Sequence, residues 1–125
     1  SRFESLGNFP EDERELLDIL RTTRAPGVVF LSGDRHATEL LRRAEPGLYP
    51  LYEFTSSPLT SGSHRNEGEA GNPARVPGTW VTERNFGLIE VAGAPKSRVL
   101  TLRTLDVRGK ELWRHTIRQG ELEPR

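Results

Sequence analysis

The stretch that decides the fold is Gly27-Val28-Val29-Phe30-Leu31-Ser32-Gly33-Asp34-Arg35-His36. It opens with a short apolar run bounded by glycine, which predicts a strand over residues 27–32 that is buried on both faces. Two small residues end the run, and Asp34 and His36 follow at once. The sequence therefore places a carboxylate and an imidazole just past the carboxyl end of a buried strand, where ligands bind in α/β sheets.

The segment before this strand has the pattern of a helix. Asn8 is a suitable amino-terminal cap, Pro10 fits the first turn, and Glu11 follows Asn8 by three residues, as in a capping box. Leucines at helical spacing form an apolar stripe, and a Pro-Gly pair ends the pattern. We expect a helix over roughly residues 9–24.

Residues 37–43 allow two interpretations. They fit two turns of helix, and they also fit a strand that turns back through Glu45-Pro46-Gly47 into a second strand over residues 48–54. The proline and glycine of this turn favour the hairpin-like return. Pro50 would then have to lie at an edge or a bulge, because proline cannot donate to a strand ladder.

The middle of the chain, residues 56–77, lacks periodicity and predicts a long irregular loop that is more mobile than the strands around it. It contains His64, which we expect to be solvated. Two interpretations stay open for this loop. It is either a surface excursion, or a functional loop whose first part, residues 55–62, borders the site at Asp34 and His36.

The last third of the chain predicts strands and turns. Alternating apolar positions are typical of an antiparallel meander with one face in water. His115 shares a strand face with two large apolar residues, so we expect it to be half-buried packing. Residues 119–125 predict a frayed tail. The expected strands cover residues 79–82, 86–91, 98–103 and 112–117.

Taken together, these patterns predict an α/β (α+β) chain, with one amino-terminal helix followed by mostly antiparallel strands. Its 125 residues suffice for one domain or a piece of one.

The 18 basic and 18 acidic residues give no net charge, so the excess of positive charge typical of nucleic-acid binding is absent. The chain contains no run of about 18 apolar residues, so the sequence predicts no membrane span. The chain has no cysteine, which excludes thiolate metal sites, and it has no methionine, which suggests a missing upstream part of the same polypeptide.

Asp34 and His36 are candidate metal ligands. If the backbone stays extended, residues two apart project the same way, so both side chains can converge on one metal or on neighbouring metals. A carboxylate with an imidazole suits Fe, Mn or Zn, and the carboxylate also suits Ca. Two metals about 3.5–4 Å apart are the usual apparatus for phosphate-ester hydrolysis. The same two residues also fit a capping aspartate beside a surface histidine, and two ligands alone cannot hold a binuclear centre.

At Leu31-Ser32-Gly33-Asp34-Arg35-His36 the sequence resembles the alkaline phosphatase D family of metallophosphatases, and the resemblance continues in order along nearly the whole chain. Asn8-Phe9-Pro10 and the helix after it look like the segment before that family's Ser-Gly-Asp-x-His motif. Further similar blocks are Tyr49-Pro50-Leu51-Tyr52-Glu53-Phe54-Thr55-Ser56-Ser57-Pro58-Leu59-Thr60-Ser61-Gly62, Val76-Pro77-Gly78-Thr79, Glu83-Arg84-Asn85-Phe86-Gly87 and Gly109-Lys110-Glu111-Leu112-Trp113.

The resemblance implies a calcineurin-like fold, which is a two-sheet β-sandwich flanked by helices with a binuclear metal centre. It implies hydrolysis of phosphate monoesters and diesters, with Asp34 and His36 as catalytic residues that bind the metals. Asp34 stands where other calcineurin-like enzymes carry the first histidine of a Gly-His-x-His motif.

The family's amino-terminal ligand motifs are absent from residues 1–125. The chain therefore resembles the carboxyl-terminal third of one phosphatase domain, and we expect it to be inactive alone. By family analogy, the enzyme would be periplasmic or secreted. The alternative is a free-standing, non-catalytic β-rich interaction domain derived from the family.

Overall fold

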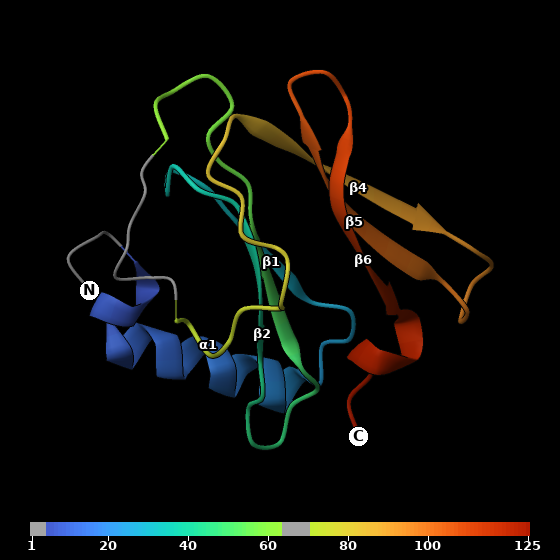
Figure 1. The fold of residues 1–125 in the computed structure, drawn as a ribbon. Coiled ribbons are helices and arrows are strands. Elements are labelled where there is room, and N and C mark those ends of the chain that lie inside the picture. Colours follow the sequence, from blue (N-terminus) through green and yellow to red (C-terminus); the bar gives the residue numbers. More distant parts are fainter. Residues whose placement is uncertain (1–4, 64–70) are drawn as a thin grey trace.

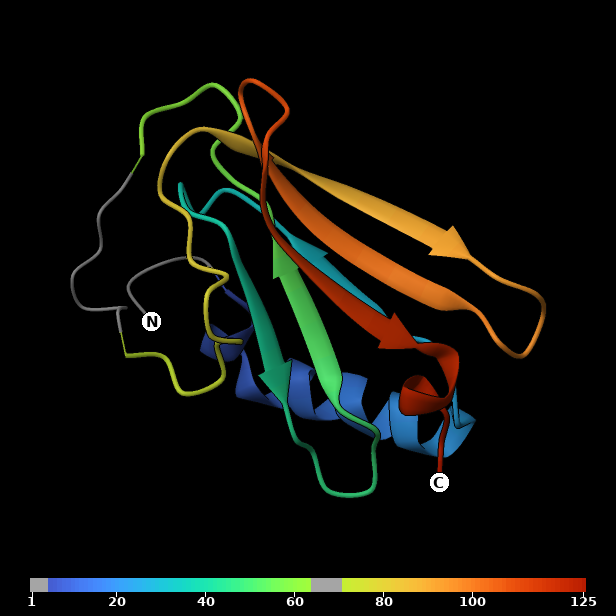
Figure 2. The same ribbon diagram turned by 45° about the vertical axis from the view of Figure 1, so that its right-hand side comes forward.

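The computed structural model describes residues 5–63 and 71–125. These residues form one α-helix and two three-stranded sheets (Figure 1). Helix α1 (Pro10–Thr23) lies against the outer face of the first sheet, and the inner face of that sheet packs on the second (Figure 2). This α+β arrangement confirms the predicted fold class, including the antiparallel strands after residue 78.

Helix α1 begins where the sequence predicts, but its predicted cap is wrong. The cap position belongs to Phe9, and no side chain caps the helix. Asn8 instead ends a short 3-10 helix, η1 (Leu6–Asn8), which runs directly into α1. Pro10 occupies the first turn, where its missing N–H leaves no hydrogen bond unmade. At the other end the helix stops at Arg24, which adopts a left-handed conformation with φ 51°.

The first sheet has the strand order β1 (Val29–Ser32), β3 (Leu51–Thr55), β2 (Glu39–Arg43). β1 pairs with β3 in parallel, and β2 pairs with β3 antiparallel. Residues 37–43 therefore follow the strand-and-hairpin interpretation rather than the helical one. Pro50 precedes the first residue of β3, so this central strand needs no bulge to accommodate it.

β1 is not buried on both faces, contrary to the prediction. It lies at one edge of the first sheet, where the described residues pair only its β3 side. Val29 and Phe30 are half-buried, but the Leu31 side chain is 63% exposed. An apolar run predicts that a strand is buried, but it does not predict which segment packs against it. Residues 5–63 and 71–125 do not cover β1 fully.

The opposite edge of the first sheet is covered by residues 74–81. Isolated bridges join Thr38 to Val81 and Leu41 to Arg75. Residues 79–82, predicted as a short strand, make only the first of these bridges. The Arg75 guanidinium stacks over the Trp80 ring at 4.1 Å and donates from Nε to the carboxylate of Glu39, 2.7 Å away. This ion pair is nearly inaccessible to water, with the Glu39 side chain 2% exposed.

The second sheet is an antiparallel meander of β4 (Asn85–Ala92), β5 (Val99–Asp106) and β6 (Glu111–Arg118). Its inner face meets that of the first sheet through aromatic contacts. The Phe54 and Trp113 rings lie edge to face with their centroids 5.3 Å apart. The most deeply buried apolar side chains of the core are Leu40, Leu102 and Ile117. The sandwich core therefore joins strands from both sheets.

The carboxyl terminus does not fray as predicted. After β6 the chain forms a short 3-10 helix, η3 (Gln119–Leu122), and the Leu122 side chain is 4% exposed within the core. The Leu122 carbonyl accepts the Gly27 N–H at 2.9 Å. Burial of Leu122 and this backbone hydrogen bond hold residues 119–122 in place, although the polar composition of the tail predicts that it is mobile.

The long middle loop is irregular where it is described. Residues 56–63 and 71–77 contain no helix and no named strand, and the Ser57–Pro58 peptide bond is cis. The prediction for His64 falls outside the described residues. Within residues 5–63 and 71–125, no helix is long and apolar enough to cross a membrane.

Candidate functional site

The predicted ligands lie in a tight turn at the carboxyl end of β1. Asp34 and His36 both adopt the left-handed backbone conformation with φ 55°, so the extended backbone assumed in the prediction is wrong. The two side chains still meet, because the turn brings Asp34 Oδ1 to 3.9 Å from His36 Nε2. Aspartate and histidine are among the residues that tolerate this conformation best, although it remains less favourable than ordinary backbone.

His36 is held on two sides by the loop that follows β3. Its backbone N–H donates to the Ser57 hydroxyl at 3.0 Å, and its ring Nδ1 lies 2.5 Å from the Gly62 carbonyl oxygen. A carbonyl only accepts, so Nδ1 carries the proton and the neutral ring has its lone pair on Nε2. This nitrogen is the one that lies near Asp34. Residues 57 and 62 belong to the segment that one interpretation of the sequence placed beside the site.

The pair fits part of a metal site. Ligand atoms about 2.1 Å from an ion can be up to about 4.2 Å apart, so a separation of 3.9 Å is compatible with one shared ion or with two neighbouring ions. The Asp34 side chain is fully exposed and that of His36 is 29% exposed, which leaves both accessible. In the described ranges, no group of three or more histidine, aspartate or glutamate side chains gathers as a metal site would require.

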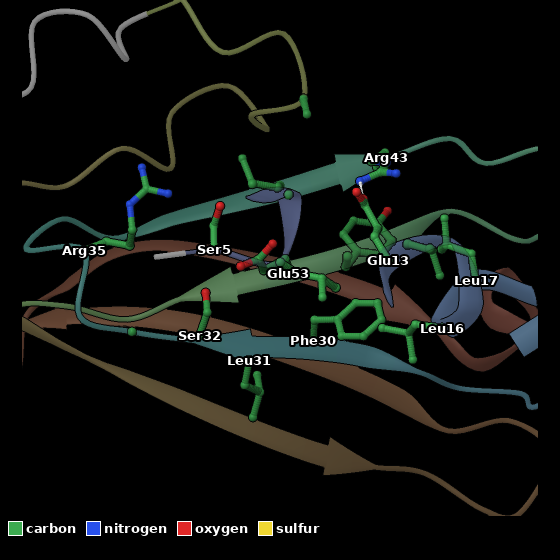
Figure 3. Close-up of a pocket in the computed structure, with 17 residues that line it drawn as sticks. Ser5, Glu13, Leu16, Leu17, Phe30, Leu31, Ser32, Arg35, Arg43 and Glu53 are labelled. Atoms are coloured by element: carbon green, nitrogen blue, oxygen red, sulfur yellow. Dashed lines mark hydrogen bonds and ion pairs between the residues drawn. The ribbon is translucent and has the colours of Figure 1, made fainter. Parts of the chain in front are cut away.

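A cavity of about 540 Å³ lies nearby, between helix α1 and the outer face of the first sheet (Figure 3). Apolar walls come from Leu16 and Leu17 of the helix and from Phe30 of β1. The Glu53 carboxylate projects into it from β3 (Figure 3). No sequence pattern predicts this cavity, because its walls come from segments far apart in the chain.

The cavity is not the crevice predicted for the ligand pair. Gly33 and Arg35 line it, but Asp34 and His36 do not. Successive residues of the turn therefore face opposite sides, one toward the cavity and the other toward the loop that follows β3. Arg35 belongs to the cavity side, and the ligand pair belongs to the side that carries Gly62.

The remaining described histidine has a structural position. The His115 ring lies against the Tyr52 ring between the two sheets, with the ring centroids 5.5 Å apart and the ring planes tilted by 45°. Burial lowers the pKa of His115 below its ordinary value, and the positive charge of Arg42 acts in the same direction, against an opposite influence of Glu121. This half-buried packing is what the sequence predicts, and it separates His115 from the ligand pair.

Comparisons with protein-family models, with curated proteins and with solved structures find no match to this chain.

Proposed function

We propose that this chain is the carboxyl-terminal part of a metallophosphatase domain similar to the alkaline phosphatase D family, in which Asp34 and His36 bind metal. The observation that carries the proposal is the approach of Asp34 Oδ1 to His36 Nε2, 3.9 Å apart at the end of β1, with the other ring nitrogen engaged by the Gly62 carbonyl. Metal-binding histidines characteristically use their second nitrogen in this way.

The proposed reaction is hydrolysis of phosphate monoesters or diesters. Two metal ions at such a centre supply a nucleophilic hydroxide at neutral pH and neutralise charge that develops on the phosphate. Asp34 would contribute a hard oxygen ligand and His36 an imidazole nitrogen, a combination suited to Fe, Mn, Zn or, at the oxygen, Ca. The turn itself contributes positioning, because the rigid end of β1 anchors its first residue.

The remaining ligands would come from an upstream part of the same polypeptide. The apolar side chains at the open side of the sandwich support this: Leu31 on β1 is 63% exposed, and Ile89 and Val91 on β4 are 41% and 64% exposed. Leu31 points away from helix α1, toward the side where β4 lies (Figure 3). Further strands added beside β1 would cover these residues and complete a calcineurin-like sandwich. An extracytoplasmic location follows the family analogy and is part of the proposal.

A non-catalytic interaction domain is the second candidate, and the same exposed residues favour it. It predicts that a binding partner covers Leu31, Ile89 and Val91 while Asp34 and His36 bind no metal. Metal binding therefore distinguishes the two candidates.

The test uses the longer polypeptide that includes the sequence upstream of Ser1, with metal content and phosphate-ester turnover as readouts. His36→Asn removes the imidazole but keeps a residue that tolerates positive φ, so the turn is preserved. We expect metal content to fall and turnover to drop at least about tenfold. His115→Gln, which removes a histidine outside the site, is the matched control and should keep both. Full metal content and turnover in His36→Asn would refute the assignment.

A further inference from the structure

The loop that holds His36 is itself fixed by a buried hydrogen-bond ring. The Ser57 N–H donates to the Thr38 hydroxyl at 2.9 Å, and that hydroxyl donates to Asn85 Oδ1 at 2.7 Å. Asn85 Nδ2 closes the ring by donating to the Ser57 carbonyl at 3.2 Å. The Ser57 carbonyl also lies 2.9 Å from the Thr38 hydroxyl, and Asn85 Nδ2 also donates to the Glu83 carbonyl at 2.8 Å. The three residues are therefore joined by several hydrogen bonds that share donors and acceptors.

The ring is shielded from water and spans the two sheets. Thr38 is 0% exposed, Asn85 1% and Ser57 7%. Asn85 begins β4 of the second sheet, and its backbone N–H donates to the Pro58 carbonyl at 3.0 Å. A hydrogen-bond network this deeply buried resists rearrangement, because breaking any one bond leaves a polar group unpaired away from water. The Ser57 peptide is thus held rigidly by contacts from both sheets.

The Ser57 side chain transfers this rigidity to the site. Its hydroxyl accepts the N–H of His36, a residue whose φ of 55° is unfavourable and needs support from its surroundings. Five residues further on, the Gly62 carbonyl accepts from the ring of the same histidine. One loop therefore fixes both the backbone and the ring of His36.

We propose that Ser57 and Asn85 are positioning residues for His36, which set its backbone conformation and keep its Nε2 directed at the metal position. This inference rests on the proposed function for the role of the metal, but not for the positioning itself. Groups of this kind around metal ligands change metal affinity by about 10–100-fold when they are removed.

The first experiment examines positioning in this chain without metal. Long-range ¹H–¹⁵N NMR spectra report which ring nitrogen of His36 carries the proton, and hydrogen exchange reports the protection of its amide. We expect the Nδ1–H form in the unmodified chain. Ser57→Ala should accelerate exchange of the His36 amide at least about tenfold, since it removes the acceptor. Ser57→Thr keeps a hydroxyl and should restore protection.

Ser56→Ala is the matched control, because this neighbouring serine contacts the first sheet through its backbone N–H, which donates to the Ser32 carbonyl. It should leave the His36 signals unchanged. Equal amide protection in Ser57→Ala and Ser56→Ala, or an Nε2–H ring in the unmodified chain, would overturn the positioning proposal. Asn85→Asp tests the far side of the ring by removing the Nδ2 donor, and it should also reduce protection of the His36 amide.

The second experiment measures Mn²⁺ affinity in the longer polypeptide. Ser57→Ala should weaken binding by about 10–100-fold while Ser56→Ala does not. Unchanged affinity in Ser57→Ala, with metal still lost in His36→Asn, would overturn positioning and leave the proposed function intact. If instead the NMR effects appear and no variant alters metal binding, the positioning proposal holds for the turn and the proposed function fails.

Discussion

The ring of Phe54 occupies the space directly over Gly87. A Cβ built on residue 87 would lie 2.8 Å from Cζ and 2.9 Å from Cε1 of Phe54, closer than real side chains approach. The ring in turn meets Trp113 on β6, so it has little freedom to withdraw. The absence of a side chain at residue 87 is therefore what allows the two sheets to pack at this distance.

Gly87→Ala should lower the free energy of unfolding by about 1–3 kcal/mol, because the added methyl group overpacks the interface between the sheets. Denaturant unfolding of the chain measures the change. Gly120→Ala is the control, since a Cβ there meets nothing within 4 Å and should leave stability nearly unchanged. Equal stabilities of the two variants would show that the sheets can separate to accept the methyl group.

The left-handed backbone at Asp34 predicts a conflict between stability and metal binding. Glycine adopts φ 55° without the Cβ penalty, so Asp34→Gly should be about 1 kcal/mol more stable than Asp34→Ala. Thermal unfolding measures the difference. Lys96→Gly, at another exposed residue with positive φ, should show the same gain over Lys96→Ala. Under the proposed function, only the substitutions at residue 34 should weaken metal binding.

The ion pair of Glu39 with Arg75 should be important for stability. Arg75→Gln leaves the buried carboxylate without its charged partner and should cost about 3–5 kcal/mol. The exposed pair of Asp18 with Arg21 provides the contrast, and Asp18→Asn should change stability by less than about 1 kcal/mol. Chemical denaturation of both variants tests this. Similar small effects would mean that water reaches Glu39 after the substitution.

His115 should make the chain less stable in mild acid. Burial lowers its pKa in the folded state below the ordinary value of 6.5, so the unfolded chain binds more protons below that pH. The free energy of unfolding is therefore expected to fall as pH drops through 6.5 toward the folded-state pKa. In His115→Leu this component should disappear. Denaturant unfolding between pH 8 and 5 checks the slope, and an unchanged pH dependence in the variant would contradict the assignment.

Titration of the exposed ion pairs on β6 should not obscure that measurement. Hydrogen bonds from Arg114 and Arg103 lower the pKa of Glu111 to about 2. Its contribution to the pH dependence of stability therefore falls mainly below its ordinary pKa of 4.5, under the range in which His115 changes its charge.

The elements that the sequence predicts well are those whose own pattern determines their structure. The leucine spacing of α1 and the alternation of β4, β5 and β6 need no information from elsewhere in the chain. The burial of Leu122 could not be predicted, because a single leucine in a polar tail is equally compatible with exposure. Likewise, the apolar run of β1 predicts burial but does not reveal that one edge of this strand has no partner among residues 5–63 and 71–125.

The candidate site was predictable as a pair of residues but not as a geometry. Asp34 and His36 follow the strand in sequence, so their proximity is local. The left-handed turn is not encoded by a glycine, and the hydrogen bond from His36 to Ser57 joins residues 21 positions apart. Contacts over such distances depend on the packing of both sheets, which a single sequence does not specify.

The two edges of the first sheet differ in whether a further strand could pair with them. Residues 74–81 cover the β2 edge, whereas no described residue pairs with the outer backbone groups of β1. In the part of the chain that the structure describes, only the β1 edge is therefore available to a further strand, next to the turn that carries Asp34 and His36. Under the proposed function, docking of such a strand and completion of the metal site would then be one cooperative event. Folding of the whole domain would thereby control when the site first becomes competent.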